Sequence, residues 1–70
     1  MRSYAGLPKL LGKLVQRYRK AAKYTQEELA EKVGISRAYM GFIEQGRFSP
    51  SLEVLEKIAK ILKVHIKDLF

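Results

Sequence analysis

Apolar residues recur along this chain with the spacing of α-helices. In the first half of the chain they form one stripe: Leu7, Leu10, Leu11, Leu14, Val15, Tyr18 and Ala22. Near the end they form a broader one: Leu52, Val54, Leu55, Ile58, Ala59, Ile61 and Leu62. Spacings of three and four residues place side chains on one face of a helix. The pattern predicts an all-α protein, and the helix at 52–63 is apolar enough that we expect it to pack from several sides.

Two short helices are predicted between residues 26 and 46. Thr25 and Glu28 have the spacing of a capping box at the start of the first helix, and Gly34 suits its end. Ser36 can then cap the second helix. The contact between them can use apolar side chains: Leu29, Ala30, Val33, Ile35, Met40 and Ile43. Two helices joined by a tight turn with glycine form a helix-turn-helix, whose second helix enters the major groove of DNA.

The remaining segments complete one domain, residues 1–70. Residues 1–6 lack periodicity and are expected to be a flexible arm, either frayed or in contact with DNA or a neighbouring subunit through Arg2 and Tyr4. Residues 47–50 form a loop that Ser51 ends as an N-cap, and residues 64–70 form a last short helical turn. The sequence therefore predicts five helices, with helices 2 and 3 forming the helix-turn-helix.

Charge narrows the choice of partner. Fourteen Lys and Arg against seven Asp and Glu give a net charge of +7, which suits a polyanion. The basic first helix could lie on a membrane surface, but its uninterrupted apolar stripe favours a core-facing helix. The beginning of the chain has no long uncharged apolar run, so we expect neither a signal peptide nor an anchor, and a cytoplasmic location.

Catalytic and metal-binding functions lack the residues they need. The chain has no cysteine and one histidine, His65, and it shows neither clustered carboxylates nor a glycine-rich phosphate loop. We therefore expect no enzyme activity, no metal, no cofactor and no small-molecule ligand.

From Leu11 to Phe70 the chain resembles the phage-repressor-type helix-turn-helix family, which includes lambda repressor and Cro. The resemblance is carried by these residues in order: Arg19, Thr25–Ala30 (TQEELA), Gly34–Ser36, Ile43, Glu44, Gly46, Pro50–Leu62 (PSLEVLEKIAKIL) and Asp68–Phe70 (DLF). It implies a compact five-helix bundle that binds operator DNA, usually as a twofold dimer, and regulates transcription.

Three outward positions of the second motif helix are predicted to contact bases. Arg37, next to the cap, can make the bidentate contact to guanine, or it can reach a phosphate instead. Ala38 is small enough to touch a thymine methyl, although helix propensity explains an alanine equally well. Phe42 either meets thymine methyls or turns inward into the core.

Phosphate contacts are expected around these positions, from Gln26, Ser36, Tyr39, Arg47 and Ser49. Gln26 begins a helix, where free N–H groups attract phosphate. The resemblance implies that it also braces the recognition helix.

The resemblance further implies a partly buried salt bridge between Arg19 and Glu44. Two positions depart from the family pattern. Lys23 replaces the usual glycine in the turn after the first helix, which predicts a strained or altered turn. Gly41 weakens the recognition helix, and it either permits close approach to DNA or reflects drift.

A dimer is predicted through Ile66, Leu69 and Phe70, unless these residues only close the core. Such a homodimer would bind a palindromic operator with half-sites about 34 to 36 Å apart or a multiple of that. The predicted function is a DNA-binding transcriptional regulator, a repressor or controller protein. The alternative is an antitoxin-like module that binds mainly a protein.

Overall fold

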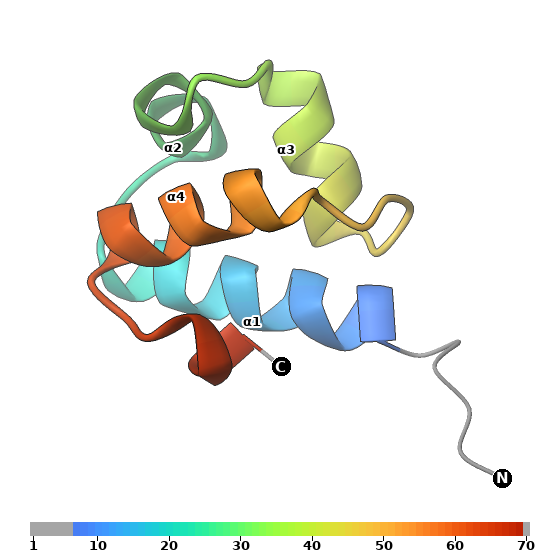
Figure 1. Ribbon diagram of the computed structural model, residues 1–70. Helices are drawn as coiled ribbons and strands as arrows, with labels where there is room; N and C mark the ends of the chain where they lie inside the picture. The colour runs from blue at the N-terminus through green and yellow to red at the C-terminus, as the bar shows by residue number, and fades with distance from the viewer. Residues whose placement is uncertain (1–6, 70) are drawn as a thin grey trace, which may run out of the picture.

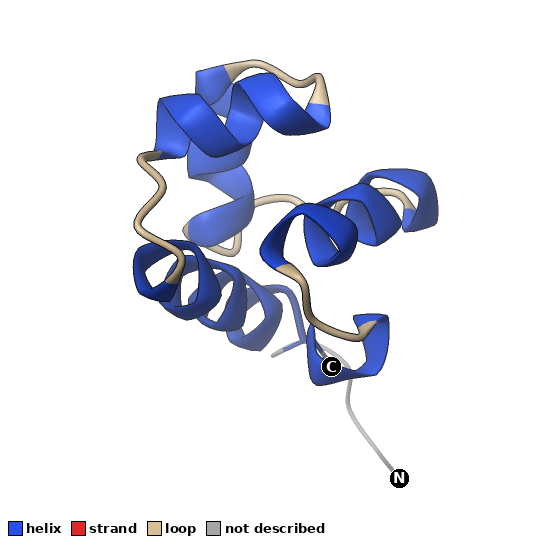
Figure 2. Cartoon of the chain, turned by 90° about the vertical axis from the view of Figure 1, so that its left-hand side faces the viewer, coloured by secondary structure: helices blue, strands red, loops and turns tan. Residues whose placement is uncertain are grey.

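The computed structural model describes residues 7–69 except the side chain of Leu7, and every regular element in that range is helical (Figures 1 and 2). The elements are α1 (Leu7–Ala21), α2 (Gln26–Val33), α3 (Arg37–Glu44), α4 (Leu52–Leu62) and a 3-10 helix, η1 (Ile66–Leu69). The all-α class is as expected. The fifth helix is a four-residue 3-10 turn, so the bundle has four α-helices within this range. The expectations for residues 1–6 and for Phe70 lie outside the described residues.

Helix starts follow the capping residues of the sequence. The Thr25 hydroxyl oxygen accepts from the Glu28 N–H at 3.0 Å, and the Glu28 carboxylate accepts from the Thr25 N–H at 2.8 Å. Ser36 accepts in the same way from the Tyr39 N–H, and Ser51 accepts from the Val54 N–H. Because each cap satisfies an N–H that has no partner inside its helix, these contacts determine where α2, α3 and α4 begin.

A single hydrophobic core joins the helices. α4 lies alongside α1 in Figure 1 and also contacts α2 and η1, while α3 packs on α1 and α2. The fully buried large side chains are Val15, Leu29, Met40, Ile43, Ile58 and Leu69. They come from every element, as expected when each amphipathic helix buries one face.

The end of the chain closes this core and corrects one prediction. Leu69 is 0% exposed, so it is a core residue and not part of a dimer interface. Ile66 is half-buried and packs against the core. The η1 turn is fastened by the Asp68 carboxylate, which accepts from the His65 N–H at 3.0 Å. The last turn therefore docks on the rest of the fold.

Two turns use a left-handed residue other than glycine. Lys23 follows α1 with φ 64°, and Lys63 caps α4 with φ 59°. The left-handed region brings Cβ close to the backbone carbonyl and costs an L-residue about 1 to 2 kcal/mol. The altered turn expected at Lys23 is therefore a strained position with the backbone shape of a glycine turn. Gly34, after α2, has the same left-handed shape without this cost (φ 88°).

Candidate nucleic-acid interface

Helix α3 has one face in the core and one in solvent. Met40, Ile43 and Glu44 are buried, whereas Arg37, Ala38 and Gln45 are exposed. The spacing of three and four residues between buried positions is that of a surface helix. Arg37 and Ala38 are thus exposed as predicted, whereas Phe42, the third position predicted to point outward, is half-buried.

Backbone contact with α1 seats the end of α3. A Cβ atom placed on Gly12 would lie 2.4 Å from the Ile43 carbonyl oxygen and 2.7 Å from that of Glu44. Real Cβ atoms do not approach that closely, so only glycine lets α1 come this near. This role of Gly12 could not be predicted from the sequence, since a glycine inside a helix indicates only a loss of helix propensity.

An ion pair fixes the same end of α3. The Arg19 Nε donates to Glu44 Oε2 at 2.7 Å, and its Nη2 donates to Oε1 at 3.1 Å. A third donor, Nη1, reaches the Tyr24 carbonyl oxygen at 2.8 Å. Both charged residues are buried, with 8% and 7% exposure. The salt bridge that the resemblance implied is thus present, and it fastens α1 and the α1–α2 turn to α3.

Gln26 joins this network from the start of α2. Its Nε2 donates to Glu44 Oε1 at 2.9 Å. Because a carboxylate only accepts, the amide nitrogen must face Glu44. The second amide hydrogen and the free N–H groups of the first helical turn remain as donors. Gln26 therefore connects the beginning of α2 to the end of α3 and braces the recognition helix, as the resemblance implied, with Glu44 as its partner.

Three aromatic side chains gather where α3 runs into the following loop. The rings of Phe42 and Phe48 meet edge to face with centroids 5.4 Å apart, and Tyr39 lies 6.1 Å from Phe48. We call Tyr39, Phe42 and Phe48 the aromatic patch. The Arg47 guanidinium lies over the Phe42 ring, 4.7 Å from its centroid, in a cation–π contact.

The position of Phe42 in the aromatic patch matches neither of its two predicted positions. Its ring is half-buried under Phe48 and Arg47 and outside the hydrophobic core, so it neither turns inward nor stands free. Phe48 is 51% exposed and had no assigned role in the sequence analysis. An aromatic residue in a short polar loop directly after a recognition helix was the signal available.

Charge in the segment from residue 36 to residue 51 is favourable to an anion. Between residues 36 and 51 the acidic residue is Glu44, which is buried and paired with Arg19, while Arg37 and Arg47 are exposed. Ser36 and Ser49 are also exposed, and Tyr39 is half-buried. Of the predicted phosphate-contacting residues, Ser36, Arg47 and Ser49 are thus exposed, and Gln26 and Tyr39 are half-buried.

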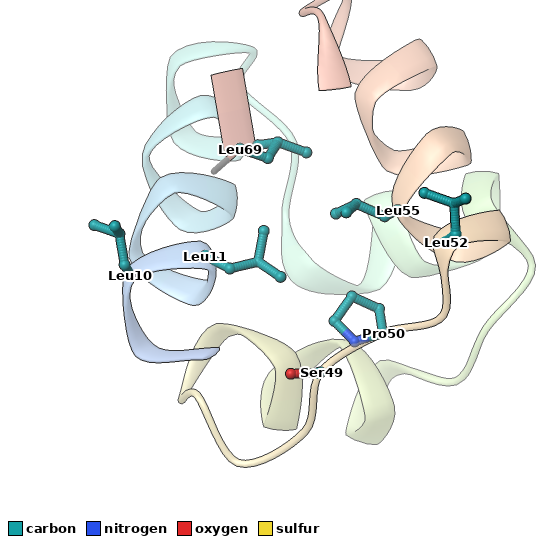
Figure 3. A pocket seen from close by; sticks show the side chains of 7 residues that line it. All are labelled: Leu10, Leu11, Ser49, Pro50, Leu52, Leu55 and Leu69. Atoms are coloured by element: carbon teal, nitrogen blue, oxygen red, sulfur yellow. The ribbon is translucent and has the colours of Figure 1, made fainter. Parts of the chain in front are cut away.

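A separate apolar groove of about 250 Å³ lies between α1, α4 and the loop that joins α3 to α4 (Figure 3). Leu11 and Leu55 point toward each other across it, with Pro50 at one end and Leu69 at the other. Leu52 and Leu10, which also line it, are 65% and 48% exposed. These two leucines belong to the predicted apolar stripes but are not covered by the fold.

Two further findings concern residues 7–69. None of the helices in this range has the length and apolar character needed to cross a membrane. Within the same range no three His, Cys, Asp or Glu side chains come together as a metal site would require.

Comparison with known proteins gives consistent matches. The family HTH_3, described as helix-turn-helix, matches residues 15–69. An uncharacterized HTH-type transcriptional regulator of Archaeoglobus fulgidus is 51% identical over 51 residues, which cover 70% of this chain and 73% of that protein.

Solved structures agree in fold. The restriction-modification controller protein C.AhdI from Aeromonas hydrophila has a TM-score of 0.87 and 34% identity, over 96% of this chain and 100% of that one. SinR, a master regulator for biofilm formation solved in complex with DNA, has a TM-score of 0.80 and 37% identity, over 84% and 95%.

Proposed function

Because the chain belongs to the helix-turn-helix family HTH_3, a family of transcriptional regulators, we propose that it binds specific duplex DNA through α3 and acts as a repressor or controller of transcription. The observation that carries the proposal is the outward face of α3. Arg37 and Ala38 stand exposed at the beginning of that helix, while its other face is held by the core and by the Arg19–Glu44 ion pair. A rigidly held helix with a free polar face suits the major groove.

Each of the predicted contact residues has a role that its chemistry supports. Arg37 donates two hydrogen bonds to guanine, and Ala38 and Phe42 make apolar contacts with bases. Phosphates are bound around them by Gln26, Ser36, Tyr39, Arg47 and Ser49. Gln26 uses the amide hydrogen that Glu44 leaves free together with the N–H groups at the start of α2.

Selection of bound duplexes from a random library, followed by salt titration, tests this proposal. Arg37→Ala should weaken binding to the selected duplex about 5- to 150-fold and relax the preference at one base position. Arg47→Ala should weaken selected and random duplexes alike and reduce the salt slope by about one. Equal losses on both duplexes for both variants would contradict the assignment. A protein that selects no sequence at any ionic strength would leave the antitoxin-like alternative.

We further propose that the chain binds a palindromic operator as a homodimer. With Leu69 in the core, we propose that the contact uses Ile66 and the exposed Leu10 and Leu52, which line the groove, while the predicted role of Phe70 lies outside the described residues. A twofold axis would bring the same leucines of both copies together, which suits a self-complementary contact.

Sedimentation at micromolar concentration tests the dimer. Leu52→Glu should give a monomer with unchanged helix content, because a charge would then be placed in an apolar contact. Lys57→Glu, also exposed on α4, is the control and should remain a dimer. A wild-type protein that sediments as a monomer on and off DNA would overturn the idea.

A further inference from the structure

Phe48 is the member of the aromatic patch whose side chain is largely exposed to solvent. Phe42 is covered by Phe48 on one side and by Arg47 on another, and Tyr39 is half-buried. Phe48 gives an edge-to-face contact to Phe42 and then leaves 51% of its surface in water. Its contacts with Phe42 and Tyr39 restrict the orientations that the Phe48 ring can adopt.

The surroundings of Phe48 point to a nucleic acid rather than a protein. Arg47 precedes it in the chain and lies over the Phe42 ring that Phe48 contacts, and Arg37 is exposed at the start of α3. No exposed acidic side chain lies between residues 36 and 51. The exposed ring of Phe48 therefore lies next to Arg47, in the segment that we propose binds DNA. In a major groove, the apolar group that meets such a side chain is the C5-methyl group of a pyrimidine.

We propose that Phe48, supported by Phe42, is a specificity-determining residue that packs on the C5-methyl group of a pyrimidine in the bound duplex. The inference rests on the proposed function and adds a second reading element beside α3. The Phe48 ring packs against Tyr39 and Phe42, which follow Arg37 by two and five residues and so lie roughly 3 to 8 Å from it along the helix axis. At 3.4 Å per base pair, and with the helix lying along the groove, we expect the methyl-bearing base about one to two base pairs from the base that Arg37 contacts.

A methyl scan of the selected duplex tests the contact. Each thymine is replaced singly by deoxyuracil, which removes the methyl group and leaves base pairing intact. We expect one position per half-site at which the wild-type protein loses about three- to fivefold in affinity, the value of one buried methyl group. At that position a cytosine and a 5-methylcytosine duplex are also compared, which distinguishes a contact to thymine alone from one to any 5-methylpyrimidine.

Two variants connect the methyl group to Phe48. Phe48→Ser should bind thymine and deoxyuracil duplexes equally at that position, while Phe48→Leu should keep most of the difference because leucine is still apolar. Both should fold as the wild type, because Phe48 lies in a loop outside the core, and thermal melting checks this.

Two results would overturn the inference. One is a flat methyl scan with a duplex that is nonetheless bound specifically. The other is a methyl preference that Phe48→Ser retains in full. Failure of the proposed function is a different result, since the wild-type protein would then select no duplex at all.

Discussion

Two helical glycines should respond to the same substitution with opposite signs. Alanine in a helix interior is favoured over glycine by about 0.5 to 1 kcal/mol. At Gly41 nothing opposes that gain, because a Cβ atom would meet only the Gln26 side-chain oxygen at an ordinary 3.7 Å. Gly41→Ala should therefore stabilise the fold by about 0.5 to 1 kcal/mol, which raises Tm by about 2 to 8 °C in a domain of this size.

At Gly12 the same methyl group meets the backbone of α3. The methyl group would lie 2.4 Å from the Ile43 carbonyl oxygen, and this clash can be relieved only if α1 and α3 move apart by roughly 1 Å. Such a substitution overpacks the contact between the two helices. Overpacking costs about 1 to 3 kcal/mol, more than helix propensity returns. The net loss is then about 1 kcal/mol at the middle of these ranges, and Gly12→Ala should lower Tm by about 4 to 8 °C.

Thermal and urea unfolding, followed by circular dichroism, measure both effects. If Gly12→Ala proves as stable as wild type, the close backbone contact between α1 and α3 is refuted. If Gly41→Ala proves less stable than the wild type, the space beside Gly41 is too small for a methyl group and our reasoning is refuted. The Gly41→Ala protein also tests whether this glycine serves DNA binding, because weaker binding by a variant at least as stable as the wild type would mean that the DNA backbone approaches it closely.

Three other substitutions test the remaining features. Arg19→Met should lower the free energy of unfolding by about 3 to 5 kcal/mol, because it leaves the Glu44 carboxylate buried without a charged partner. The double variant Arg19→Met with Glu44→Leu should recover much of this loss. A loss well below about 3 kcal/mol for the single variant in urea unfolding would contradict the pairing. Lys23→Gly should stabilise by about 1 kcal/mol by relieving the left-handed backbone, whereas Lys20→Gly, in helical backbone, should destabilise. Hydrogen bonds from the Thr25 backbone and hydroxyl hold the pKa of Glu28 below its ordinary 4.5. The ionised carboxylate therefore contributes to folding stability above pH 4.5, and this contribution is lost as the pH falls below that value. Glu28→Gln should make stability depend less on pH in this range, and an unchanged pH dependence would refute the cap.

The sequence was most informative where local chemistry determines structure. Thr25, Glu28, Ser36 and Ser51 act on N–H groups within three residues of themselves, so their caps could be predicted without knowing the fold. The helical periodicity likewise separated most buried from exposed positions. Resemblance to a family supplied the Arg19–Glu44 pair, which no local pattern contains because 25 residues separate its members.

What sequence could not provide depends on distant contacts. Leu69 is apolar whether it faces the core or a second subunit, and only the docking of η1 decides between them. The position of Phe48 against Phe42 is set by the path of a loop, which periodicity does not describe. The proximity of Gly12 to Ile43 requires two helices to be placed relative to each other.

Because α3 is seated through Gly12, Met40, Ile43 and Glu44, the side chains that face outward are free to vary. Arg37, Ala38 and Gln45 can be exchanged without altering how the helix is mounted. The fold is therefore suited to engineering a new DNA sequence preference by substitution of a few exposed residues. We expect the thermal stability of each such variant to remain close to that of the wild type.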